Sequence, residues 1–266
     1  FGAELNSLQK IENDFEYIWQ ADSQYWARHS PVLFPIVGRL KNDIYFYKDK
    51  KYSLSQHGFA RDKEFELIKK EDDFIEFSLK NDEKTFEIYP FLFELNISYK
   101  LEKTKLIISY KVKNRSEDRL YFSIGAHPAF NISSGDFLDF EDVRTSKRYF
   151  LNDKGLIYKN QEVSFTKNSL ILDEEIFKND ALVFNDKNIK SIILRDKNSN
   201  KILKVEFKDF PYLGVWSKPN LAPFVCIEPW FGVADEENSN QNIEDKRGVQ
   251  VLLKDELFSC FYSIEI

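Results

Sequence analysis

Methionine is absent from the 266 residues, and cysteine and histidine are scarce, with two and three copies. Cys226 and Cys260 form no C-x-x-C pair, and no two of the three histidines are spaced like zinc ligands, so neither a disulfide framework nor a local zinc site is predicted. The nucleotide loops G-x-G-x-x-G and G-x-x-x-x-G-K-[ST] are missing as well. We therefore expect no metal and no cofactor, and reduced cysteines favour a cytoplasmic location.

Long apolar runs and blocks of like charge are also missing. No stretch approaches the ~20 apolar residues of a membrane-spanning helix, and the start at Phe1 carries no signal-peptide pattern. The 38 basic and 44 acidic residues are scattered, with a net charge of −6. Neither a membrane nor nucleic acid is expected as a partner. The lack of methionine and the start at Phe1 leave open that the extreme N-terminus is missing.

Aromatic residues are abundant. They make up 16% of the chain, including 25 Phe and 13 Tyr, which is ample material for a large core. No Pro/Gly/Ser-rich linker and no repeat of fixed period divides the sequence. Because all-β proteins of this length can form one domain, we predict a single domain over residues 1–266.

Apolar residues mostly alternate with polar ones, which is typical of half-buried strands. Short polar turns separate several of these segments and predict hairpins. The clearest alternating segments are 75–79, 97–101, 106–112, 192–195, 203–207 and 262–266. Helical turns are expected only near 173–179 and 243–246. We predict an all-β fold, a large antiparallel β-sandwich.

Two polar residues each follow an apolar run and precede a proline: Glu228 in "VCIEPW" and His127 in "IGAHPAFNI". A residue before proline is held extended, so each side chain is predicted to lie on a stiff backbone where its strand ends or bulges. A Glu and a His held in this way would suit acid–base chemistry. Taken singly, a salt-bridged rim Glu and a hydrogen-bonded packing His are the commoner interpretations.

Other polar and aromatic residues have ordinary structural interpretations when taken alone. Arg39 and Arg61 would be surface charges or ion-pair partners. Asp180 would be a turn or helix-cap residue, and Trp216 a core residue. We leave His29 as structural.

Six motifs together resemble one family. In chain order they are "SPVLFPIVGRLKND", "SQHGFARD", "IGAHPAFNI", "NDALVF", "FPYLGVWS" and "CIEPWFGVAD". The same order is found in the aldose 1-epimerase (galactose mutarotase-like) family, and the match to its LacX-like branch spans about Trp19 to Asp235. The resemblance implies a β-supersandwich and a cofactor-independent isomerase that interconverts the α and β anomers of a hexose.

The resemblance also implies roles for individual residues. Glu228 is similar to the family's general base and His127 to its general acid. The residues that match substrate-holding positions are His57, Arg39, Asp180, Arg61 and Trp216. The expected partner is therefore a small sugar, a hexose or a hexose phosphate, and the expected state is a monomer or a homodimer.

Two departures from the pattern keep alternatives open. Ala129 and Trp230 stand where classical galactose mutarotases have tyrosine and glutamine, which puts galactose in doubt. "HGFAR" also resembles hexose-6-phosphate 1-epimerases, in which Arg61 with Arg28 or Arg39 would hold a phosphate. A further alternative is a non-catalytic carbohydrate-binding protein, against which the presence of both Glu228 and His127 argues.

Overall fold

A computed structural model describes residues 1–12, 14–173, 175–219 and 222–266. The chain forms two compact units, each built from separate stretches of sequence. Unit 1 comprises Phe1–Ala3, Val32–Gly125 and Phe231–Ser263. Unit 2 comprises Glu4–Pro31, Ala126–Trp230 and Ile264–Ile266. The single domain over 1–266 stays a prediction.

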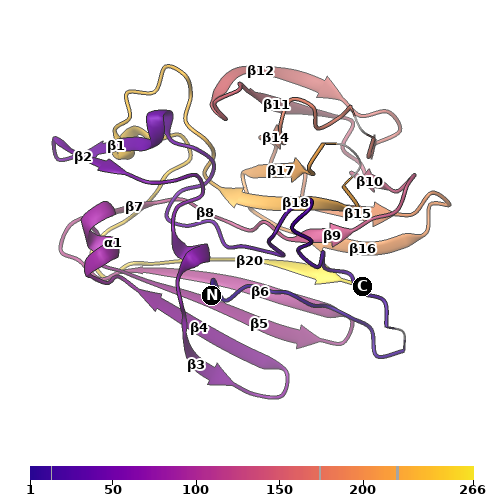
Figure 1. Ribbon diagram of the computed structural model, residues 1–266, viewed down its shortest axis with the longest axis horizontal. Coiled ribbons are helices and arrows are strands. Elements are labelled where there is room, and N and C mark those ends of the chain that lie inside the picture. The colour runs from indigo at the N-terminus through magenta and orange to yellow at the C-terminus, as the bar shows by residue number, and fades with distance from the viewer. Residues whose placement is uncertain (13, 174, 220–221) are drawn as a thin grey trace. The chain divides into compact units, whose positions relative to one another are not determined.

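Unit 1 carries long antiparallel strands in the order β20-β6-β5-β4-β3 (Figure 1). Its strands are β1 (Ile44–Tyr47), β2 (Lys50–Ser53), β3 (Glu66–Lys70), β4 (Phe74–Lys80), β5 (Phe93–Glu102), β6 (Lys105–Asn114), β7 (Leu120–Phe122), β8 (Ile124–Gly125), β19 (Gln250–Leu252) and β20 (Leu257–Glu265), which ends in unit 2. Its helices are η1 (Lys41–Asp43), η2 (Ala60–Asp62), α1 (Glu83–Ile88) and η3 (Ile243–Asp245).

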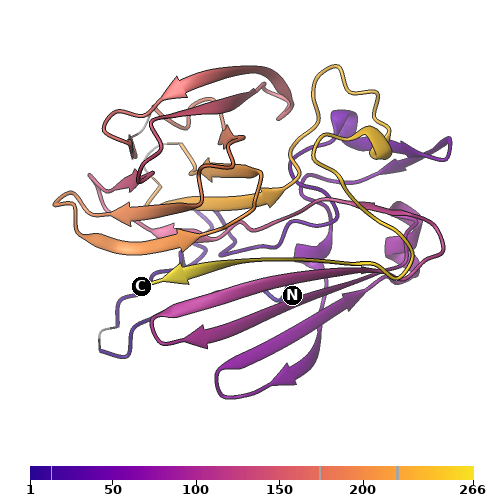
Figure 2. The ribbon, with the colours of Figure 1, turned by 180° about the vertical axis from the view of Figure 1, so that it is seen from behind.

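The predicted hairpin of residues 97–101 and 106–112 is confirmed as β5 and β6, which pair from Phe93 opposite Asn114 to Glu102 opposite Lys105. Apolar and polar residues alternate along β6, and the apolar ones, Leu106, Ile108, Tyr110 and Val112, are buried on one face. A shift of the pairing by one residue would expose them, so this pattern fixes the register. Figure 2 shows the two-residue loop of this hairpin and the longer β3–β4 loop from behind.

Unit 2 contains two runs of antiparallel strands, β13-β10-β15-β16 and β12-β11-β14-β17-β18, and β9 pairs with β18. The strands are β9 (Ala129–Asn131), β10 (Phe137–Asp139), β11 (Thr145–Leu151), β12 (Ile157–Ser164), β13 (Ser169–Ile171), β14 (Leu182–Phe184), β15 (Ser191–Arg195), β16 (Lys201–Glu206), β17 (Tyr212–Trp216) and β18 (Phe224–Phe231). Stacked and edge-on rings of Phe140, Phe165 and Phe184 join the two runs in an aromatic core.

The all-β prediction with large antiparallel sheets is confirmed. The expected turn near 243–246 is η3. The one near 173–179 includes residue 174, which lies outside the described residues, and 175–179 form turns without a helix. The prediction missed α1, which is capped by Asp82 and Thr85. None of the helices in the described part of the chain has the length and apolar character that a membrane crossing requires.

The expectation that the strand of "VCIEPW" ends at Glu228 is wrong. β18 continues to Phe231, with Pro229 opposite Leu213 and Trp230 opposite Tyr212 on β17. Proline lacks only the N–H donor, and the Pro229 carbonyl still accepts a hydrogen bond from the Ala126 N–H at 3.0 Å. The carboxylate of Glu228 therefore projects from within a strand, not from its end.

Candidate active site

Glu228 lies in β18, which is buried from Phe224 to Trp230, and is itself only 1% exposed. Its partner across the ladder is Gly214 of β17. A Cβ at Gly214 would stand 2.4 Å from the ring of Trp230, so glycine is what allows that indole to lie against β17. Trp230 in turn donates from Nε1 to the Ala126 carbonyl at 3.2 Å, next to His127.

Three backbone or indole contacts hold His127 beside Glu228. Besides the two contacts to Ala126, the Ile227 N–H donates to the Pro128 carbonyl at 3.2 Å. The residues before and after His127, Ala126 and Pro128, are therefore both hydrogen-bonded to β18. The result is a separation of 3.2 Å between His127 Nε2 and Glu228 Oε2, with both side chains buried. The structure thus brings the two predicted catalytic residues into contact, which the sequence alone did not show.

The environment of Glu228 disfavours its charge. Burial raises the pKa of the Glu228 carboxyl well above its usual range, and the nearby Asp180 carboxylate raises it further, while the indole of Trp230 lowers it. Glu228 Oε2 accepts no hydrogen bond from the described residues, so its contact with His127 is a close polar approach without hydrogen-bond alignment. A desolvated carboxylate of this kind binds a proton more strongly than one in water.

Asp180 stands just before β14, with a left-handed backbone at φ 70°, and its Oδ1 accepts from the Ala181 N–H at 2.8 Å. Its electrostatic effect on Glu228 places it in the same neighbourhood. Cys226, two residues before Glu228 on β18, is a third neighbour. The sulfur of Cys226 and ligand atoms of His127 and Glu228 all lie within 4.8 Å of one another, a donor set that is able to hold a metal ion.

Aromatic rings surround His127. Trp26 is stacked on the imidazole, with centroids 4.8 Å apart and planes at 25°, and Trp216 meets it edge-on at 5.8 Å. The two indoles also contact each other at 5.6 Å. Trp216 was predicted as a site residue, but Trp26 was missed, because a tryptophan in the irregular segment "YWARHSP" shows no periodicity or motif that marks it. The contacts that position Trp26 beside His127 are tertiary or irregular. The Trp26 N–H donates to the Asp22 carbonyl, and Trp19 Nε1 donates to the Trp26 carbonyl at 2.9 Å.

The other predicted site residues lie in unit 1, around Gln56. Arg39 Nη2 donates to Gln56 Oε1 at 3.3 Å, and Arg61 Nη2 donates to the Gln56 carbonyl at 2.8 Å. His57, with φ 67°, is buried, and its Nδ1 accepts from the Gly38 N–H at 3.2 Å. An imidazole nitrogen that accepts a hydrogen bond carries no hydrogen, so the ring hydrogen of His57 is on Nε2.

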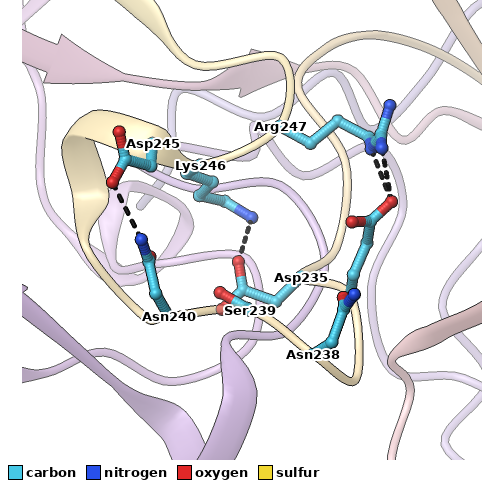
Figure 3. A pocket seen from close by; sticks show the side chains of 8 residues that line it. Asp235, Asn238, Ser239, Asn240, Asp245, Lys246 and Arg247 are labelled. Atoms are coloured by element: carbon cyan, nitrogen blue, oxygen red, sulfur yellow. Dashed lines mark hydrogen bonds and ion pairs between the residues drawn. The ribbon is translucent and has the colours of Figure 1, made fainter.

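A buried ion pair that the sequence did not suggest supports this part of unit 1. Lys246 Nζ donates to Asp235 Oδ1 at 2.9 Å (Figure 3). It also donates to the Val233 carbonyl at 2.7 Å. Asp235 Oδ2 accepts from the Lys41 N–H at 3.0 Å, and the Asp235 N–H donates to the Arg39 carbonyl at 2.9 Å. Asp235 therefore holds the backbone on both sides of Leu40, next to Arg39.

The ion pair borders a polar pocket of about 400 Å³ (Figure 3). At the same pocket Arg247 donates to the carboxylate of Glu236. Burial lowers the pKa of Lys246, and Asp235 opposes that shift. The polar groups drawn there bond mainly to one another, so the pocket is interpreted as part of the support of the loop and not as a ligand site.

Comparison with known proteins gives consistent results. The family model described as aldose 1-epimerase matches residues 1–250. The chromosomal protein LacX of Lactococcus lactis subsp. lactis is 34% identical, and the alignment covers 100% of this chain and 94% of that protein.

Two solved structures have the same fold. A galactose mutarotase related enzyme from Lactobacillus acidophilus superimposes with a TM-score of 0.93 at 36% identity, covering 99% of this chain and 91% of the other. A galactose mutarotase-like protein from Lactobacillus casei ATCC 334 also reaches 0.93, at 28% identity, with 99% and 94% covered. The predicted galactose mutarotase-like fold is therefore confirmed.

Proposed function

Because the chain belongs to the aldose 1-epimerase family, and so to the isomerases, we propose that it interconverts the α and β anomers of a hexose by opening and closing the sugar ring. The observation that carries this proposal is the 3.2 Å contact between His127 Nε2 and Glu228 Oε2 in a buried site. A mutarotase needs one group that takes a proton and one that donates it, and this pair supplies both.

In the proposed reaction Glu228 takes the proton of the anomeric hydroxyl while His127 donates a proton to the ring oxygen. The C1–O5 bond breaks, the C1–C2 bond rotates in the open aldehyde, and closure reverses both transfers. The raised pKa of Glu228 makes it a stronger base than a carboxylate in water. Each positioned acid or base is expected to contribute about 10²- to 10⁴-fold.

The other predicted residues are proposed to hold the sugar. The guanidinium groups of Arg39 and Arg61 and Nε2 of His57 are donors suited to sugar hydroxyls, and the carboxylate of Asp180 is an acceptor. The ring of Trp216 is suited to pack on an apolar face of the sugar. Trp26 is proposed to orient the imidazole on which it stacks.

Polarimetry tests the proposal directly. Freshly dissolved α-glucose, α-galactose and α-glucose 6-phosphate are followed with and without protein, and we expect acceleration for at least one of them. Glu228→Gln and His127→Asn, both close in shape to the natural residues, should remove it. If either variant keeps the full rate, the assigned roles are wrong. If sugars bind but none responds, the protein is a carbohydrate-binding module instead.

A hexose 6-phosphate is the second candidate substrate. Two guanidinium groups, those of Arg39 and Arg61, bond to the same residue, Gln56, which is a local concentration of positive charge suited to a phosphate. Arg39 also lies 3.7 Å from Asp43 and Arg61 3.8 Å from Asp62, which reduces that charge. Arg61→Gln separates the candidates, because it should raise KM for the phosphorylated sugar more than for the free one.

A further inference from the structure

Cys226 has no part in the proposed reaction, although its sulfur lies within 4.8 Å of the ligand atoms of His127 and Glu228. All three side chains are buried, and Cys226 and Glu228 come from the same strand. Glu228 Oε2 lacks a hydrogen-bond donor among the described residues. A buried carboxylate oxygen that accepts no hydrogen bond is stabilised when a cation binds to it.

The chemistry of the three donors selects a particular class of ion. A thiolate, an imidazole and a carboxylate are all zinc ligands, and three protein ligands with a fourth open position are the pattern of an accessible zinc site. Thiolate is a soft ligand that Mg²⁺ and Ca²⁺ do not favour, so a zinc-like ion is preferred over them. The 3.2 Å between His127 Nε2 and Glu228 Oε2 is close to the separation of two ligands on one tetrahedral ion with bonds of about 2.0 to 2.2 Å.

We propose that Cys226, His127 and Glu228 form an inhibitory site for Zn²⁺ and similar soft divalent ions. The bound ion would occupy Nε2 of His127 and the carboxylate of Glu228, and any protons carried by the Cys226 thiol, by His127 Nε2 and by the Glu228 carboxyl would be released to the solvent as the bonds to the metal form. His127 then has no proton to donate and Glu228 cannot accept one. The inhibitory effect rests on the proposed function of these two residues, whereas the metal site itself rests only on the three donors.

Cobalt substitution tests the site without any assay of activity. The protein is titrated with Co²⁺ alone, and we expect the near-ultraviolet absorption of a Co²⁺–thiolate bond together with the visible bands of a four-coordinate ion. Addition of Zn²⁺ should remove both signals, and a large excess of Mg²⁺ should not. If the thiolate band does not form, or if Mg²⁺ removes it, the proposal fails.

The two cysteines provide a matched pair of variants. Cys226→Ala should abolish the thiolate band and weaken Zn²⁺ binding at least about tenfold by calorimetry, whereas Cys260→Ala, on β20, should change neither. Equal Zn²⁺ affinity in the two variants would contradict the site. If Cys226→Ala does not fold, Glu228→Gln removes a ligand at almost constant volume and should also weaken binding at least about tenfold.

Inhibition is measured separately, as the ratio of mutarotation rates with and without Zn²⁺ for each variant. We expect Zn²⁺ to inhibit the natural protein and Cys260→Ala alike, and Cys226→Ala only at concentrations at least about tenfold higher. If the thiolate band forms but no sugar is mutarotated, the proposed function is refuted and the metal site is still supported. Mutarotation that Zn²⁺ does not slow, in a protein shown to bind it, would refute the inhibitory role.

Discussion

Two buried carboxylates seven residues apart in the sequence have opposite environments. Glu228 of unit 2 faces an imidazole, lies near the acidic Asp180 and has one oxygen without a hydrogen-bond donor among the described residues. Asp235 of unit 1 is just as buried, yet its two oxygens accept from the Lys246 ammonium and the Lys41 N–H. Burial alone therefore does not identify a reactive carboxylate, because its bonding partners decide what it does.

The difference concerns the groups that bond to each carboxylate. A carboxylate that accepts from an ammonium and a backbone N–H is held in place by both donors. A carboxylate with few donors and an acidic neighbour holds a proton more readily, which is the property that a general base needs. Glu228 is thus suited to proton transfer, and Asp235 to holding the backbone beside Arg39.

The largest expected effect is on activity. Glu228→Gln should reduce the mutarotation rate by about 10²- to 10⁴-fold, because the amide cannot take the proton. The same change should leave the free energy of unfolding at neutral pH equal or higher, since it removes a carboxyl whose charge the fold disfavours. Polarimetry and urea unfolding provide the two measurements. If the variant keeps the rate but loses stability, Glu228 has a structural role like that of Asp235, and the proposed difference between the two carboxylates is wrong.

The next largest effect is on stability. Lys246→Met should cost about 3 to 5 kcal/mol in the free energy of unfolding, because it leaves Asp235 buried without its cation. Urea unfolding measures this. The double variant Asp235→Asn/Lys246→Met is the matched control and should recover part of the loss. If it is no more stable than Lys246→Met, the stranded charge is not the cause.

The pH dependence should differ in sign between the two regions. The folded-state pKa of Glu228 is raised above 4.5, so its contribution to stability is present below pH 4.5 and is lost as pH rises through the folded value. The folded-state pKa of Lys246 is lowered below 10.5, so its contribution is present above pH 10.5 and is lost as pH falls through the folded value.

These two windows are measured as differences from variants that lack the group. The natural protein should lose stability relative to Glu228→Gln as pH rises above 4.5, and gain stability relative to Lys246→Met as pH approaches 10.5. Each slope is at most about 1.4 kcal/mol per pH unit, for one proton. Slopes of the same sign would show that the two environments are alike.

The smallest expected effect concerns the support of His127. Trp26→Leu removes the ring stacked on the imidazole and should lower kcat by about 2- to 10-fold, which corresponds to about 0.5 to 1.5 kcal/mol for an aromatic pair. KM should change less than kcat, and Trp26→Phe should restore most of the rate. Phe140→Leu is the control, because Phe140 lies in the aromatic cluster with Phe165 and Phe184. An equal loss of kcat in Phe140→Leu would indicate a general packing defect.

Local patterns in the sequence were enough to predict several strands and to mark Glu228 and His127 as candidate site residues. Alternation determined which face of β6 is buried, because side chains in a strand point alternately to its two sides. Proline after His127 and Glu228 marked both as held residues. The same rule failed for the end of β18, because the pairing of Pro229 through its carbonyl depends on Ala126, about a hundred residues earlier.

By itself the sequence determined the all-β fold, the family resemblance and the choice of Glu228 and His127. Only the tertiary structure decided that these two side chains touch, that Trp26 stacks on one of them, and that Cys226 lies beside both. The structure also decided which buried carboxylate is paired, since Asp235 meets Lys246 through the folding of a loop. The reason is physical: local periodicity reports on neighbours along the chain, whereas desolvation and charge depend on neighbours in space.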